Sequence, residues 1–127
     1  MRGKKIVLDL EFIPYRRKQE PYCVHEIIEI GAVALDADNE IYDEFQMYVK
    51  PQYGTVPPFV TAITGITNEM LVGQVSFSEA MQAFEAWLPQ EDSYRFYTWS
   101  GSDQHVFQAE AEWKERPLLG NFYGWWV

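Results

Sequence analysis

Two carboxylates separated by one residue, Asp9 and Glu11, end an apolar stretch near the start of the chain, KKIVLDLEF. In an extended strand, side chains two residues apart point to the same face, which places these two acids on the order of 6 to 7 Å apart. Two carboxylates at that distance repel each other. A fold keeps such a pair when a cation binds between them, or when the end of the strand is simply solvated.

A third carboxylate, Asp103, follows a strand candidate and opens a helix candidate. The strand candidate is Tyr94–Trp99, which is rich in aromatic residues. Ser100 or Ser102 can cap the helix that follows, so Asp103 would lie in its first turn, where the helix dipole favours a carboxylate. The alternative for Asp103 is a simple helix-terminal charge with no ligand.

The remaining strand candidates lie in the first half of the chain. Lys4 to Leu10 is predicted to be a buried strand, and residues 26–35 and 40–49 are predicted to form a β-hairpin around the turn DADN. Residues 13–24 contain two prolines and show no periodicity, which predicts a loop of about a dozen residues.

Helices are predicted between this hairpin and Tyr94. The segment 58–72 contains two short helical candidates separated by Gly65, with Thr67 placed to cap the second. A stronger amphipathic pattern begins at Ser76 and ends at Pro89.

This order of elements predicts a mixed α/β fold, in which an antiparallel hairpin on the first strand is followed by a helical crossover to a parallel strand. With 127 residues, of which 47% are hydrophobic, the chain is long enough for one packed domain. It contains no apolar run of bilayer length and no signal-peptide pattern, and its single cysteine, Cys23, excludes an internal disulfide. These features predict a soluble, cytoplasmic protein.

The formal net charge of −9 argues against nucleic-acid binding if the charge is evenly spread. The basic residues are concentrated, however, because six of the ten lie in the first eighteen positions. They could form a basic rim around the carboxylate pair, or a solvated loop tip. The six are Arg2, Lys4, Lys5, Arg16, Arg17 and Lys18.

Four stretches, in this order along the chain, are IVLDLEF, HEIIEIGAV, FVTAITGITNEML and YTWSGSDQHVF. Together they resemble a DEDDh-type 3′-to-5′ exonuclease of the ribonuclease H-like superfamily, with the exoribonuclease subgroup as the most similar. The resemblance implies a metal-dependent hydrolase that releases nucleoside monophosphates from the 3′ end of single-stranded RNA or DNA, with RNA slightly favoured.

The resemblance also implies roles for the three acids. Asp9 would bridge two divalent ions, Mg²⁺ or Mn²⁺, while Glu11 would hold the ion that activates water and Asp103 would support the other. The cation is then favoured over the solvated strand end as the reason for the Asp9 and Glu11 pair. Glu29 matches a recurrent position of the family that could support the strand or the metal.

Contacts to the terminal nucleotide are implied for five further residues. One segment lies where the family packs against the last base. A further residue follows the glutamate of the family's first motif, Asp-x-Glu, where the family usually has a small polar side chain. The segment is Ile63, Thr64, Gly65 and Ile66, and the further residue is Phe12.

The third motif of the family, a histidine followed five residues later by an aspartate, is not found after Asp103. Neither His25 nor His105 lies at the position of that histidine, which serves the family as general base. The resemblance therefore implies that residues 1–127 form a single incomplete exonuclease domain, truncated before the last strand and helix and inactive or weakly active. The alternative function is a non-catalytic, exonuclease-like binding or interaction domain.

The apolar end of the chain, YGWWV, agrees with such a truncation. Trp113, Trp125 and Trp126 would then expose surface that the absent helix covers, which predicts self-association through the C-terminal part.

Overall fold

The computed structural model describes residues 4–16, 23–89, 94–98 and 101–116. Within these ranges the strands form one sheet in the order β3-β2-β1-β4. β1 pairs with β2 and β2 with β3 in antiparallel fashion, whereas β4 pairs with β1 in parallel. The predicted mixed α/β sheet with an antiparallel hairpin and a helical crossover is confirmed. The strands are β1 (Lys4–Arg16), β2 (Cys23–Leu35), β3 (Ile41–Tyr48) and β4 (Tyr94–Tyr97).

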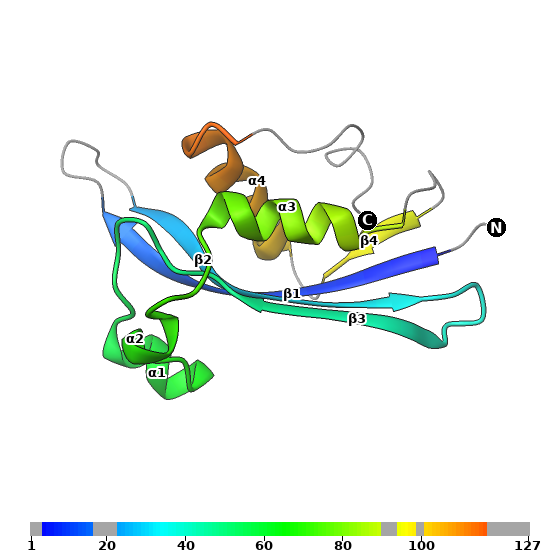
Figure 1. Cartoon of the computed structure of the whole chain (residues 1–127), viewed down its shortest axis with the longest axis horizontal. Coiled ribbons are helices and arrows are strands. Elements are labelled where there is room, and N and C mark those ends of the chain that lie inside the picture. The colour runs from blue at the N-terminus through cyan, green and yellow to red at the C-terminus, as the bar shows by residue number, and fades with distance from the viewer. Residues whose placement is uncertain (1–3, 17–22, 90–93, 99–100, 117–127) are drawn as a thin grey trace.

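The helices lie on both sides of this sheet (Figure 1). α3 and α4 cover one face, and α1 and α2 lie beyond the other face at the end of the sheet. Each side has its own cluster of buried apolar residues. The helices are α1 (Pro58–Thr64), α2 (Asn68–Leu71), α3 (Phe77–Trp87) and α4 (Gly101–Trp113). No helix in the described part of the chain has the length and apolar character needed to span a membrane.

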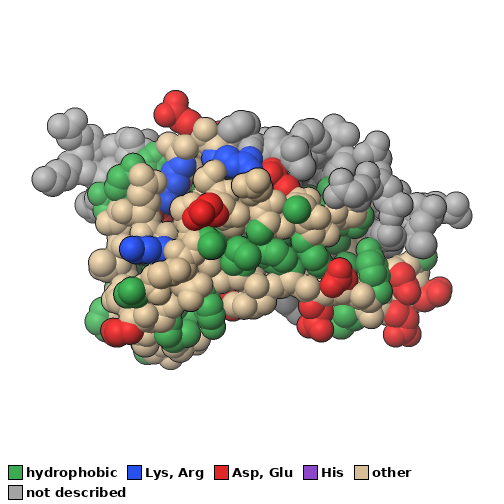
Figure 2. All heavy atoms as spheres, in the orientation of Figure 1, with side chains coloured by type: hydrophobic (Ala, Val, Ile, Leu, Met, Phe, Trp, Pro, Cys, Tyr) green, Lys and Arg blue, Asp and Glu red, His purple; other side chains and the backbone are tan. Residues whose placement is uncertain are grey.

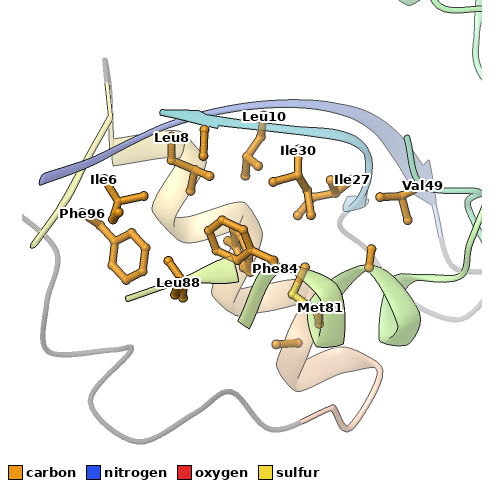
Figure 3. Packing of buried hydrophobic residues seen from close by; sticks show 14 of the residues in the cluster. Ile6, Leu8, Leu10, Ile27, Ile30, Val49, Met81, Phe84, Leu88 and Phe96 are labelled. Atoms are coloured by element: carbon orange, nitrogen blue, oxygen red, sulfur yellow. The ribbon is translucent and has the colours of Figure 1, made fainter. Parts of the chain in front are cut away.

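The alternation of side chains along β1 decides which of them reach the main core. Ile6, Leu8 and Leu10 are buried and point toward α3 and α4, as Figure 3 shows. Because side chains alternate across a strand, Asp9 and Glu11 belong to the opposite face. The apolar pattern of KKIVLDLEF therefore fixes the direction of the two acids.

The prediction that residues 13–24 form a loop is wrong for residues 13–16 and for residues 23 and 24. β1 continues to Arg16 and β2 begins at Cys23, with Pro14 opposite His25. β4 pairs with β1 only as far as Val7, so among the described strands the far end of β1 has a free edge. Proline is tolerated at such an edge because no ladder bond from its nitrogen is needed there. Residues 17–22 lie outside the described ranges.

A register shift interrupts the β1–β2 ladder beside the acids. Glu11 pairs with Glu29 and Phe12 with Ile27, which leaves Ile28 as an additional residue of β2. Ile28 is buried in the cluster between the sheet and helices α1 and α2. The bulge lets β2 bury Ile28 on that side and still present Glu29 directly opposite Glu11.

Local signals set the helix boundaries as the sequence predicts. Ser76 and Glu79 form a reciprocal capping box at the start of α3, and the bonds from Ser76 lower the pKa of the Glu79 carboxyl. Thr67 caps α2 by accepting a hydrogen bond from the N–H of Met70. Gly65 ends α1 with φ of 80°, a left-handed conformation that favours glycine.

The acidic surplus of the chain is partly local. Exposed carboxylates gather at the turn between β2 and β3 and along β3, where the space-filling view shows a group of acidic side chains (Figure 2). Of the six basic residues near the N-terminus, only Lys5 lies among the described side chains, and its Nζ donates to Oδ1 of Asn39 at 2.6 Å. The basic rim stays a prediction.

Candidate active site

The free edge of β1 beyond β4 is the place where the three acids meet. β4 stops pairing at Val7, and the chain then enters α4, whose first turn contains Asp103. Oδ2 of Asp103 accepts a hydrogen bond from the N–H of Leu10 at 3.3 Å. Leu10 lies between Asp9 and Glu11, so one bond places Asp103 next to the acidic pair. Crevices beyond the carboxyl ends of parallel strands are common ligand sites in α/β proteins.

The electrostatic environment of Glu11 agrees with this placement of the acids. Burial raises the pKa of the Glu11 carboxyl, and the charges of Asp9, Glu29 and Asp103 raise it further, in decreasing order. A carboxylate is affected by other carboxylates in this way only when they lie close together. The structure thus brings together the three acids predicted from the sequence and adds Glu29 to them.

Asp103 is subject to opposing influences. Partial burial raises the pKa of its carboxyl most strongly, the hydrogen bond from Leu10 lowers it, and the charge of Asp9 raises it again. The bond from the backbone therefore holds an acid in a position that its neighbours disfavour.

Glu29 is held by a contact on the neighbouring strand. Nε2 of Gln46 on β3 donates to Oε2 of Glu29 at 2.8 Å. Glu29 thus lies opposite Glu11 with its carboxylate fixed toward β3, in keeping with a supporting position beside the acids.

The chemistry of this cluster fits divalent cations. Carboxylate oxygens are the ligands that Mg²⁺ and Mn²⁺ prefer, and a cation would relieve the repulsion that adds to the effect of burial on the pKa of Glu11. Among the described residues, however, no three His, Cys, Asp or Glu side chains are arranged to surround one ion. The acids are gathered at one edge without forming a coordination shell.

The segment predicted to contact a nucleotide is divided between surface and core. Ile63 is 80% exposed at the end of α1, whereas Ile66 is 2% exposed and belongs to the cluster between the sheet and helices α1 and α2. Oγ1 of Thr64 donates to the carbonyl of Val60 and accepts from the N–H of Ile66. Ile63 and Gly65 are the exposed residues of this segment and are therefore the ones open to a ligand.

Phe12 lies on the face of the sheet that α3 and α4 cover. It is partly buried against the main core and meets His25 edge-on, with ring centroids 5.3 Å apart. Burial, and to a smaller extent the nearby His105, lower the pKa of the His25 imidazole. Phe12 and His25 therefore belong to the α4 side of the sheet, whereas the side chains of Asp9 and Glu11 point to the opposite side.

Three residues that the sequence did not single out form a buried ionic cluster near the site. Glu26 and Glu110 are almost fully buried, and Nζ of Lys114 contacts both of their carboxylates, at 2.8 and 2.7 Å. The only sequence signal is the spacing of Glu110 and Lys114, four residues apart on a predicted helix. Such a pair usually lies on a solvated helix face, so its burial could not be expected.

Comparison with known proteins identifies the family. A family model described as exonuclease, RNase_T, matches residues 6–112, which contain all three acids. The chain belongs to this exonuclease family. The resemblance inferred from the four sequence stretches is thereby confirmed.

Curated relatives of this exonuclease-family chain include enzymes named for both nucleic acids. The human 3′-5′ exoribonuclease 1 is 33% identical over 82 residues, which are 63% of this chain and 24% of the relative. The DNA polymerase III subunit epsilon of Pasteurella multocida is 37% identical over 81 residues, 64% of this chain and 32% of the relative. The chain thus spans about a third or less of these proteins.

A solved structure supports the fold. The nuclease domain of 3′hExo, described as a DEDDh family member bound to rAMP, superimposes with a TM-score of 0.74 at 24% identity. The match covers 91% of this chain and 62% of that domain. The exonuclease family and its ribonuclease H-like fold are therefore established for the described sheet and helices.

Proposed function

We propose that the chain supplies the acidic site of a 3′-to-5′ exonuclease, which hydrolyses the terminal phosphodiester of single-stranded nucleic acid. The observation that carries the proposal is the contact between Asp103 and Leu10, which brings an acid from α4 to the edge where Asp9 and Glu11 emerge from β1. Three acids from two distant segments gather there despite their mutual repulsion. A purely structural role would not require that repulsion.

In this proposal Asp9, Glu11 and Asp103 hold divalent ions, Mg²⁺ or Mn²⁺. When bound, such ions supply an activated water and stabilise the charge on the leaving oxygen. The residues of the chain position the site: β1 fixes Asp9 and Glu11 on one face, and the Leu10 amide orients the carboxylate of Asp103. Glu29, opposite Glu11, adds negative charge that favours cation binding.

We further propose that the substrate is a single-stranded 3′ end, with RNA preferred over DNA. The names of the relatives support a nucleic-acid substrate, and the sequence HEIIEIGAV supports the exoribonuclease subgroup. Ile63 and Phe59 are exposed on α1, one helical turn apart, and offer apolar surface on which a terminal base could stack.

A digestion experiment tests the catalytic part. The chain is incubated with 5′-labelled single-stranded RNA and DNA of equal sequence, with Mn²⁺, with Mg²⁺ and with EDTA. Because the sequence predicts weak activity at most for residues 1–127, we expect a faint ladder of products shortened from the 3′ end, which depends on metal and is lost in Asp9→Asn. Glu44→Gln is the matched control, because it removes one exposed carboxylate of β3 without touching the site.

A binding experiment tests the site independently of turnover. Electron paramagnetic resonance of free Mn²⁺ should reveal bound ions in the wild type and in Glu44→Gln, and weaker binding in Asp9→Asn. Absence of Mn²⁺ binding at millimolar concentration would contradict the proposal. The non-catalytic binding domain would then be favoured, an alternative that agrees with the lack of a coordinating arrangement among the described residues.

A further inference from the structure

Two acidic side chains of α4 accept hydrogen bonds from the backbone of the sheet. Asp103 accepts from the N–H of Leu10 on β1 at 3.3 Å, and Glu110 accepts from the N–H of Ile27 on β2 at 2.7 Å. Seven residues, about two helical turns, separate the two acids, so they lie on the same side of α4. The helix is therefore attached to two neighbouring strands at two points.

The two attachments differ in strength. Glu110 is 1% exposed and its bond to Ile27 is short, whereas Asp103 is half-buried and its bond to Leu10 is longer. A hydrogen bond buried in a low-dielectric environment is electrostatically stronger than one open to water. Glu110 is thus the firmer attachment. Because α4 is one continuous helix, fixing it at Glu110 also fixes the location of its first turn, which contains Asp103.

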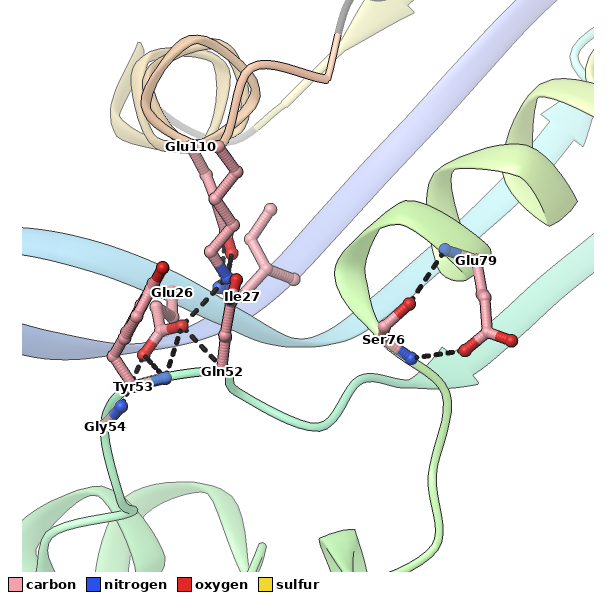
Figure 4. A network of polar contacts seen from close by, with 9 residues as sticks. Glu26, Ile27, Gln52, Tyr53, Gly54, Ser76, Glu79 and Glu110 are labelled. Atoms are coloured by element: carbon pink, nitrogen blue, oxygen red, sulfur yellow. Dashed lines mark hydrogen bonds and ion pairs between the residues drawn. The ribbon is translucent and has the colours of Figure 1, made fainter.

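Lys114 links this attachment to the rest of the sheet. Its Nζ bonds Oε2 of Glu110 at 2.7 Å and Oε2 of Glu26 at 2.8 Å. Glu26 in turn accepts hydrogen bonds from the backbone N–H groups of residues 52–54, which follow β3 (Figure 4). One buried cluster therefore joins α4, β2 and the connection from β3 to α1.

We infer that Glu110 is a positioning residue for the acidic site, because its bond to Ile27 holds α4 where Asp103 meets Leu10. The inference about metal rests on the proposed function, whereas the inference about Asp103 rests on the two hydrogen bonds alone. Replacement of a residue that hydrogen-bonds directly to a metal ligand typically changes metal affinity by about 10- to 100-fold, and Glu110, which acts through α4, should have an effect at the lower end of this range.

Matched replacements of Glu110 separate this role from simple packing. Glu110→Leu has a similar volume but no acceptor for Ile27, and Glu110→Gln keeps an oxygen at the end of an equally long side chain. Glu110→Asp retains the charge but is one methylene shorter, so it weakens the bond and provides a test if Glu110→Leu does not fold.

Amide hydrogen exchange measured by nuclear magnetic resonance gives the first readout. We expect exchange at Leu10 to be about tenfold faster in Glu110→Leu, as for the loss of one hydrogen bond, and near wild type in Glu110→Gln. The amide of Val33 on β2, which pairs with β1 on one side and β3 on the other, serves as the reference for global stability. Unchanged exchange at Leu10 in both Glu110→Leu and Glu110→Asp would overturn the inference.

Mn²⁺ affinity gives the second readout. We expect roughly tenfold weaker binding in Glu110→Leu and recovery to near the wild-type value in Glu110→Gln. Faster exchange at Leu10 with unchanged Mn²⁺ affinity would overturn the link between Glu110 and the site. If the wild type binds no Mn²⁺, the proposed function fails, and exchange at Leu10 alone decides whether Glu110 positions Asp103.

Discussion

The carboxylate of Asp103 accepts the N–H of Leu10, the residue between Asp9 and Glu11. This bond joins residues 93 positions apart in the sequence and crosses from the first turn of α4 to the free edge of β1. It lowers the pKa of an acid that burial and Asp9 push upward. The arrangement of the site therefore depends on one backbone amide as well as on three carboxylates.

Replacement of Asp103 by asparagine should separate its structural contribution from its charge. The asparagine amide would keep an oxygen acceptor for Leu10, so we expect Asp103→Asn to be at least as stable as wild type without metal, because one repelling charge is removed. Asp103→Ala loses the acceptor and should be less stable than Asp103→Asn. Thermal denaturation in EDTA measures both. A less stable Asp103→Asn than Asp103→Ala would contradict this assignment.

Stability should fall as the pH rises toward neutrality, because of Glu110. Burial raises the pKa of this carboxyl from 4.5 to about 7, although Lys114 and the N–H of Ile27 oppose the shift and Glu26 adds to it. Between these values the folded chain keeps a proton that the unfolded chain has released, so the contribution to stability is largest below pH 4.5 and is lost by about pH 7. The difference is on the order of 3 kcal/mol.

Urea denaturation at several pH values measures this dependence. Glu110→Gln should flatten it, because the amide does not titrate, while the oxygen still accepts from Ile27. His25 lines the same small cavity as Glu110, and burial lowers the pKa of its imidazole. Replacement of His25 by glutamine provides the control that separates its contribution. An unchanged pH slope in Glu110→Gln would assign the effect to other groups.

Lys114 should be indispensable for stability. It is the cation between two buried carboxylates, and its ammonium also lies 5.3 Å from the ring centre of Phe77. Lys114→Met keeps most of the side-chain length but removes the ammonium that contacts the buried carboxyl groups of Glu26 and Glu110. We expect a loss of about 3 to 5 kcal/mol in the free energy of unfolding.

The matched control for that replacement is Lys50→Met, at an exposed position after β3. It should change the free energy of unfolding by no more than about 0.5 kcal/mol. Chemical denaturation of both variants at the same pH is the measurement. Similar effects of the two replacements would show that the buried ion pairs contribute little.

The sequence predicts those parts of the site that depend on local pattern. Alternation in KKIVLDLEF places Asp9 and Glu11 on one face, and the start of a helix at Asp103 is readable from the residues around it. The capping box of Ser76 and Glu79 is equally local. Each of these signals spans a few neighbouring residues, so no knowledge of tertiary contacts is needed.

What the sequence does not predict depends on tertiary context. Pro14 suggests a loop, yet it lies in β1 because that end of the strand has a free edge. The bulge at Ile28 depends on two cores that bury opposite faces of β2. Glu110 and Lys114 have the spacing of a surface pair, and only the packing of α4 on β2 reveals that they are buried.

A side chain at Gly54 should destabilise the fold, because a Cβ there would be closely packed against Ile13 and Glu26. Its N–H donates to Oε1 of Glu26 at 2.7 Å, and a Cβ added there would lie 3.0 Å from Cδ1 of Ile13 and 3.1 Å from Oε1 of Glu26. Ile13 and Glu26 are both fully buried, so neither can move freely. We expect Gly54→Ala to lower the free energy of unfolding by about 1 to 3 kcal/mol, as overpacking of a core does.

Gly31 on β2 offers a matched control. A Cβ there would meet only the carbonyl oxygen of Asp9 at an ordinary 3.5 Å, so Gly31→Ala should be neutral or stabilising by up to about 1 kcal/mol. Both variants are compared with wild type by urea denaturation, and exchange at the amides of residues 52–54 shows whether the contact with Glu26 is lost. If Gly54→Ala is as stable as Gly31→Ala and those amides stay protected, the connection after β3 can accommodate a side chain, and the buried cluster does not depend on close approach of the backbone at Gly54.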